Sequence, residues 1–86
     1  MNENDMYNGF ALSVLNKLRE KVSGKIIFGI YKDSDMIVFK VFFKDFQFKY
    51  AIKDVTQIIL TGNIDKVVDE LTAKYKNVVL KAFFKA

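Results

Sequence analysis

Hydrophobic residues recur every three or four positions near the start of the chain, which is the spacing of an amphipathic helix. This pattern predicts a helix between Gly9 and Ser23, ended by Gly24. Its apolar positions are Phe10, Ala11, Val14, Leu15, Leu18 and Val22. We expect residues 1–8, which precede the pattern, to be flexible.

The same spacing returns in the last third of the chain. It predicts a helix of about five turns that begins near Asn63 or Ile64. Asp65 would lie in its first turn, where the helix dipole favours a negative charge. The apolar stripe of this helix comprises Ile64, Val67, Val68, Leu71, Tyr75, Val78, Val79 and Ala82.

Between these stretches, from Lys25 to Ile52, runs rich in Ile, Val, Phe and Tyr are separated by polar breaks at residues 32–35 and 44–45, a pattern typical of strands. A two-residue loop at 44–45 pairs Phe43 with Phe46, and a four-residue loop at 32–35 pairs Ile30 with Ile37. Both registers put the same residues on one apolar face. The sequence therefore predicts a three-stranded antiparallel meander whose inner face contains Ile26, Phe28, Ile30, Ile37, Phe39, Val41, Phe43, Phe46, Phe48, Tyr50 and Ile52.

Residues 55–61 fit two structures. Asp54 is a suitable N-cap and Gly62 a suitable stop, so we favour a short helix, and a fourth strand is the alternative. The predicted fold class is then α+β: one domain of residues 1–86 with two layers, in which helices cover one face of the sheet and the elements follow the order α-β-β-β-α-α.

The opposite face of the predicted sheet is the candidate interaction site. The register places Lys40 directly across from Lys49, a like-charge pair that is unfavourable for folding alone. Three interpretations are open: a solvated face whose lysines cover scattered apolar residues, a protein-binding or homodimer surface, or a basic aromatic platform for nucleic acid. The candidate residues are Lys25, Tyr31, Met36, Lys40, Phe42, Lys49 and Lys53.

Composition excludes several kinds of chemistry. The chain has no cysteine, histidine, proline or tryptophan, and therefore no residues for thiol nucleophiles, Ser-His-Asp relays, disulfides or Cys/His zinc sites. Glycine-rich phosphate-binding motifs are missing from the sequence. Asp33 and Asp35 form a D-x-D pattern that we interpret as turn residues rather than metal ligands. We expect no enzymatic activity, no cofactor and no small-molecule substrate.

The net charge of +4 is concentrated toward the C-terminus, because residues 71–86 contain four lysines and no acid. These lysines either complement the helix dipole or attract nucleic acid or an anionic membrane. For Phe83 and Phe84 we favour packing against the core over insertion into a membrane. The start of the chain lacks the pattern of a signal peptide and no run is long enough to span a membrane, so we expect a cytoplasmic protein.

The predicted order of elements is shared with double-stranded-RNA-binding domains, but residues 63–70 contain three acids and one lysine where those domains carry a basic motif. This difference argues against their mode of RNA binding.

The second half of the chain resembles small uncharacterised proteins encoded by phages and prophages of low-GC Gram-positive bacteria. The likeness lies in residues 46–55, Gly62, Val67-Val68, residues 74–76 and residues 83–85. It implies an accessory role in a phage or prophage, such as binding a host or phage protein in the bacterial host cell, and transfers no site residue. The leading hypothesis is a non-enzymatic binding module that associates with a protein or with itself. The alternative is a small basic nucleic-acid-binding protein.

Overall fold

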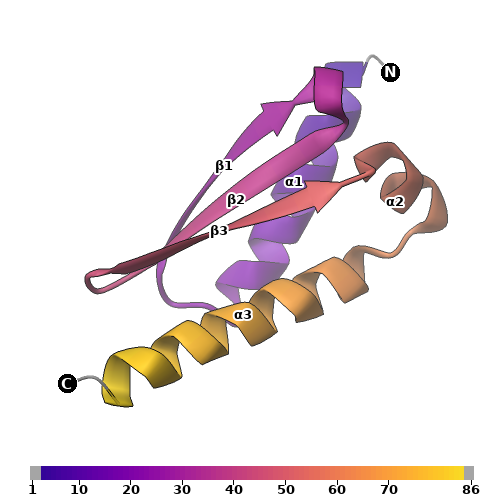
Figure 1. The fold of residues 1–86 in the computed structure, drawn as a ribbon. Helices are drawn as coiled ribbons and strands as arrows, with labels where there is room; N and C mark the ends of the chain where they lie inside the picture. Colours follow the sequence, from indigo (N-terminus) through magenta and orange to yellow (C-terminus); the bar gives the residue numbers. More distant parts are fainter. Residues whose placement is uncertain (1–2, 85–86) are drawn as a thin grey trace.

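A computed structural model describes residues 3–84, and the side chains of residues 5–84. The chain forms three helices, three strands and one short 3-10 turn (Figure 1). In order these are α1 (Glu3–Arg19), β1 (Lys25–Tyr31), η1 (Lys32–Ser34), β2 (Met36–Phe43), β3 (Phe46–Lys53), α2 (Val55–Thr61) and α3 (Ile64–Phe84). The predicted α+β class and the order α-β-β-β-α-α are confirmed.

The strands form one antiparallel sheet in the order β1-β2-β3, and its register matches the predicted one. Ile30 pairs with Ile37 across the first turn, and Phe43 pairs with Phe46 across the second. The second turn lacks glycine, and Lys44 adopts a positive φ of 53° to close it. Register therefore follows the hydrophobic pattern of the strands, because a one-residue slip would turn each strand's apolar side chains to the opposite face.

Helices α1 and α3 pack on the same face of the sheet and on each other. The centre of the core is completely buried and contains Phe39 and Ile37 from β2, Leu18 and Val14 from α1, and Leu71 from α3. Lys17 pairs with Asp65 at 2.9 Å and Lys21 with Asp69 at 3.6 Å, which joins the exposed sides of the two helices.

Helix α1 differs from the predicted helix at both ends. It begins at Glu3 rather than near Gly9, and Tyr7 is buried in the core. It ends at Arg19 rather than Ser23, and the next residues form a turn in which the N–H of Val22 donates to the Leu18 carbonyl at 2.7 Å. Residues 3–8 thus belong to the helix, whereas residues 1–2 lie outside the described part of the chain. The flexibility expected for residues 1–8 stays a prediction.

Residues 55–61 are helical, as favoured from the cap signals, and Gly62 ends α2 in the left-handed conformation with φ 72°. The expectation that the Asp54 side chain caps α2 is wrong. Asp54 occupies the N-cap position, but its side chain makes no capping hydrogen bond. The first turn of α2 is capped instead by Asp35, which precedes β2 in the chain and also adopts a left-handed conformation with φ 49°.

The C-terminal half of α3 departs from the predicted packing. Its buried residues extend from Val67 to Tyr75, after which Val78 and Val79 are only half-buried. Phe83 and Phe84 are 63% and 86% exposed, so the expectation that they pack against the core is wrong. The helix continues past the point where the α1 layer ends, and its last turns have no helical neighbour to cover them (Figure 1).

Candidate functional site

The face of the sheet opposite α1 and α3 is the candidate site, and we call it the outer face. Its residues form four cross-strand rows: Lys25-Phe42-Gln47, Ile27-Lys40-Lys49, Gly29-Val38-Ala51 and Tyr31-Met36-Lys53. All seven predicted site residues belong to these rows. The structure therefore brings the predicted residues together on one surface.

Aromatic and aliphatic side chains are partly exposed on the outer face. Tyr31 is 52% exposed and Ile27 is 46% exposed, whereas Met36, Val38 and Phe42 are half-buried. Together with these half-buried neighbours, Ile27 and Tyr31 give the outer face its accessible apolar surface.

The ring of Tyr31 folds back along its own strand and covers Gly29. A Cβ atom built on Gly29 would lie 3.4 Å from Cε2 and 3.5 Å from the hydroxyl oxygen of this tyrosine. These are ordinary van der Waals distances, so the ring lies against residue 29 of its own strand. Beside the ring is a shallow hollow of about 280 Å³, whose lining includes Ile27, Val38, Lys40 and Lys49.

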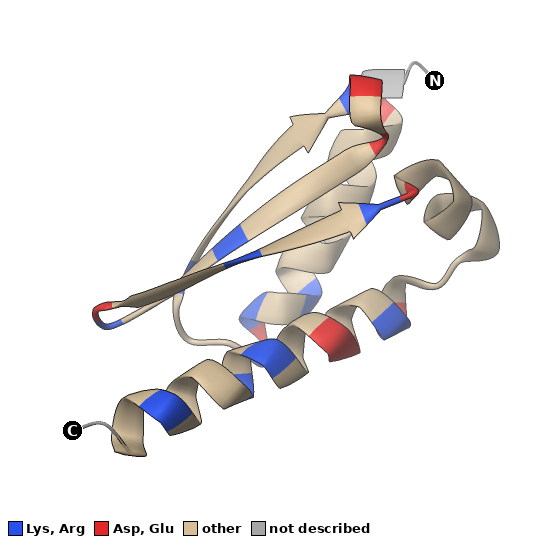
Figure 2. Cartoon of the chain, in the orientation of Figure 1, with Lys and Arg blue, Asp and Glu red and all other residues tan. Residues whose placement is uncertain are grey.

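All charged residues of the outer face are basic. Its rows contain four lysines, Lys25, Lys40, Lys49 and Lys53, and no acidic residue. Figure 2 shows the acidic positions of the sheet region at the turns and strand ends rather than along the strands. Lys40 lies directly opposite Lys49, as predicted, and its ammonium nitrogen lies 5.4 Å from the centre of the Phe42 ring. An anionic group bound between the two lysines would relieve their repulsion.

The polar contacts of the inner face join β3 to α3. The Tyr50 hydroxyl donates a hydrogen bond to a carboxylate oxygen of Glu70, which links β3 to α3. Burial, followed by this hydrogen bond and the negative charge of Glu70, raises the pKa of Tyr50 to about 12. The phenol therefore stays protonated and has no tendency to act as a base near neutral pH. Lys74 lies 5.8 Å from the Tyr50 ring centre and donates to the Lys49 carbonyl at 3.0 Å.

The D-x-D pattern separates into two different roles. Asp33 is exposed in η1, as expected for a turn residue. Asp35 accepts hydrogen bonds from the Tyr7 hydroxyl at 2.7 Å and from the N–H and hydroxyl of Thr56 at 3.0 and 2.8 Å. Within residues 3–84, no cluster of three or more acidic side chains is placed to hold a metal ion.

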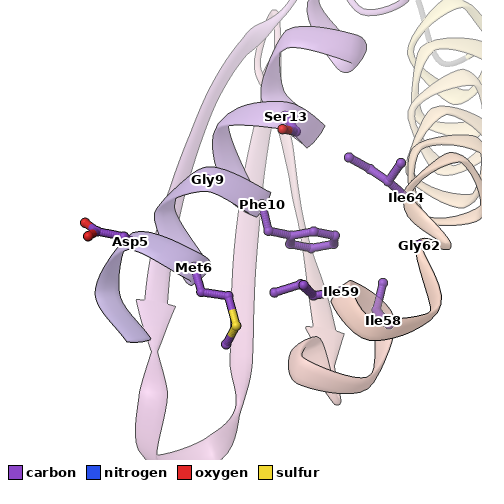
Figure 3. Close-up of a pocket in the computed structure, with 9 residues that line it drawn as sticks. All are labelled: Asp5, Met6, Gly9, Phe10, Ser13, Ile58, Ile59, Gly62 and Ile64. Carbon is purple, nitrogen blue, oxygen red and sulfur yellow. The ribbon is translucent and has the colours of Figure 1, made fainter. Parts of the chain in front are cut away.

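Sequence reasoning missed a groove between α1 and α2, shown in Figure 3. Phe10, Ile59 and Ile64 point toward one another across it, whereas Asp5 points away. Its volume is about 350 Å³, and Met6 and Ile58 complete most of its apolar lining. Phe10 lies in the predicted helix, whereas Met6 was missed because it lies in the segment expected to precede that helix.

The chain matches no protein-family model, no curated protein and no solved structure. Among the described residues, no helix is both long enough and apolar enough to cross a bilayer. The site must therefore be interpreted from its own geometry and charge.

Proposed function

We propose that the chain is a non-enzymatic binding module that associates with a protein partner through the outer face. The observation that supports this proposal is the combination, on one uncovered sheet face, of exposed Ile27 and Tyr31 with four lysines and no acid. Apolar contacts supply affinity in such an interface, and charges select the partner and speed its encounter.

Charge favours a partner with an acidic surface over a second copy of the chain. Face-to-face pairing of two copies would bring the Lys40 and Lys49 of one copy against the lysines of the other, and like charges brought together at an interface are costly. An acidic partner would instead neutralise the cross-strand pair. The phage or prophage setting of this accessory role rests on the resemblance of the second half of the chain.

A photo-crosslinker placed on the outer face tests the proposal. The chain has no cysteine, so Ala51→Cys provides a single attachment point on an exposed position of this face. Ala73→Cys, on the exposed side of α3, is the matched control. In a lysate of a low-GC Gram-positive bacterium we expect the Ala51 probe, and not the Ala73 probe, to form one adduct that is sensitive to protease and resistant to nuclease. Equal labelling from both positions, or an adduct removed by nuclease, would contradict the proposal.

Reversing one charge of the lysine pair should separate binding from folding. In Lys49→Glu an opposite-charge pair replaces the like-charge pair, so we expect stability at or above that of the unmodified chain. The yield of the Ala51 adduct should fall about tenfold or more, because the variant presents an acid to an acidic partner. Lys66→Glu makes the same charge change on an exposed position of α3 and should leave the adduct unchanged.

The position of the Tyr31 ring supports single-stranded nucleic acid as a second candidate. A half-exposed ring that lies along the sheet, next to Lys40 and Lys49, offers a stacking surface beside two phosphate-binding groups.

We expect fluorescence anisotropy with labelled single-stranded oligonucleotides to show, under this candidate, an affinity that falls with salt at a logarithmic slope of about −3, since four lysine contacts each contribute roughly −0.7. Tyr31→Leu should weaken this binding about tenfold or more without changing the slope. Absence of binding at low salt would exclude nucleic acid while leaving the protein-binding proposal standing.

A further inference from the structure

The last turns of α3 expose three large apolar side chains outside the hydrophobic core. Leu80 is 53% exposed, and Phe83 and Phe84 are more exposed still. We call these three residues the α3 tip. Leu80 and Phe84 are four positions apart and therefore share one side of the helix, where they line a shallow hollow of about 390 Å³ together with Asn77 and Lys81. Phe83 lies next to them and faces the β2–β3 turn.

The surroundings of the α3 tip are basic. Lys76 and Lys81 are exposed on the same helix. Lys44, in the β2–β3 turn, places its ammonium nitrogen 5.2 Å from the centre of the Phe83 ring. Asp45 of that turn is the neighbouring acid, so the three lysines leave a net positive charge around the apolar residues. Residues 71–84 of the helix itself contain no acid.

We propose that the α3 tip is a peripheral binding site for an anionic lipid surface. Its three apolar side chains would enter the boundary between headgroups and acyl chains, and Lys44, Lys76 and Lys81 would contact the anionic headgroups. The site lies at the end of the molecule where the helix and the β2–β3 turn meet, so the protein would be anchored by one end and would not span the bilayer (Figure 1).

Charge complementarity identifies the occupant. A second copy of the chain would bring its own lysines against Lys76 and Lys81, which would oppose apolar contact between two tips. An anionic membrane offers both an apolar layer for Leu80, Phe83 and Phe84 and negative charge for the lysines beside them. This site shares no residue with the outer face, so it stands or fails independently of the proposed function.

Vesicle binding with a fluorescent reporter tests the proposal. The chain has no tryptophan, so Phe84→Trp introduces a single reporter at the most exposed position of the tip. We expect its emission to shift to shorter wavelength with phosphatidylglycerol vesicles at low salt, and not with phosphatidylcholine vesicles. In co-sedimentation with the same vesicles, the bound fraction of the double variant Leu80→Ser with Phe83→Ser should be about tenfold or more below that of the unmodified chain. Reversing Lys76 and Lys81 to Glu should lower the bound fraction in the same way.

Matched controls distinguish binding through the α3 tip from non-specific adsorption to vesicles. Leu60→Ser removes an exposed leucine of α2, which is 75% exposed, and Lys66→Glu reverses a charge at the other end of α3. Both variants should bind vesicles as well as the unmodified chain, and far-UV circular dichroism should show native helix content for every variant. The proposal is overturned if phosphatidylglycerol vesicles do not bind the chain, if the tip variants bind as well as the controls, or if sedimentation without lipid shows a dimer that the tip variants abolish.

Discussion

Replacing Asp35 with alanine is expected to lower the free energy of unfolding by about 2–4 kcal/mol, because three hydrogen bonds to a charged acceptor are lost together. Two of the donors come from Thr56, and the third is the hydroxyl of the buried Tyr7. The variant would leave these donors without their acceptor at the junction of α1, β2 and α2. It would also put alanine at a left-handed position, where φ is 49°. Urea unfolding monitored by circular dichroism measures the loss.

Asp33→Ala is the matched control, because it removes the same side chain two positions earlier from an exposed turn. We expect its stability to lie within about 0.5 kcal/mol of the unmodified chain. Asp35→Asn should fall between the two, since an amide oxygen can still accept from Tyr7 but carries no charge. Equal stability of the Asp33 and Asp35 variants would show that the carboxylate of Asp35 does not hold the three segments together.

The same residue makes stability depend on pH in a defined direction. The pKa of Asp35 lies below its ordinary value of 3.8. The hydrogen bond from Tyr7 is the largest cause, and the bonds from Thr56 also lower the pKa, whereas partial burial acts to raise it. A carboxyl with a depressed pKa in the folded state contributes stability above its unfolded pKa and loses it as the pH falls through the folded value. Stability should therefore decline on acidification below about pH 5, with a shallower decline in Asp35→Asn.

Gly24→Ala is expected to destabilise the protein by about 2–4 kcal/mol, because the added methyl group would clash with main-chain atoms. A Cβ atom at this position would lie 2.0 Å from the carbonyl oxygen of Phe42, far inside contact distance. The obstacle is the backbone of β2, so relief requires the α1–β1 connection to move away from the sheet. Thermal and urea unfolding, compared with the unmodified chain, measure the effect.

Gly9→Ala is the control for this substitution. A Cβ atom at Gly9 meets nothing within 4 Å, and Gly9 lies inside α1. Alanine costs less backbone entropy than glycine in a helix, so this variant should be more stable by about 0.5–1 kcal/mol. If Gly24→Ala unfolds at the same denaturant concentration as the unmodified chain, the close approach of residue 24 to β2 is wrong.

The sheet could be predicted from sequence because its signals were local. Alternation of apolar and polar residues set the faces, and the two turn lengths gave one consistent register. The candidate face followed from the same parity, so all seven predicted site residues lie on it. The side on which the helices pack followed too, since four lysines lie on the outer face and none lies on the inner face.

The features that escaped prediction depend on contacts between distant segments. Asp54 has the right residue type and position for an N-cap, yet the capping carboxylate comes from Asp35, 21 residues from Thr56. Gly24 was interpreted as a helix stop, whereas its closest constraint is the carbonyl of Phe42. The apolar stripe of α3 continues to Ala82, but the core beneath it ends near Tyr75. Periodicity indicates which side of a helix is apolar and does not indicate how far its neighbours extend.

The four lysines of the outer face also affect which face of the sheet the helices cover. A three-stranded meander has two faces on which helices can pack. The helices α1 and α3 pack as a pair, joined by the bond between Lys17 and Asp65. If the helices packed on the outer face, they would remove four charged side chains from water, which is far more costly than leaving those charges solvated. These side chains are Lys25, Lys40, Lys49 and Lys53. The four lysines therefore favour packing of the helices on the inner face, and the surface that we propose for partner binding is the one on which helix packing would be costly.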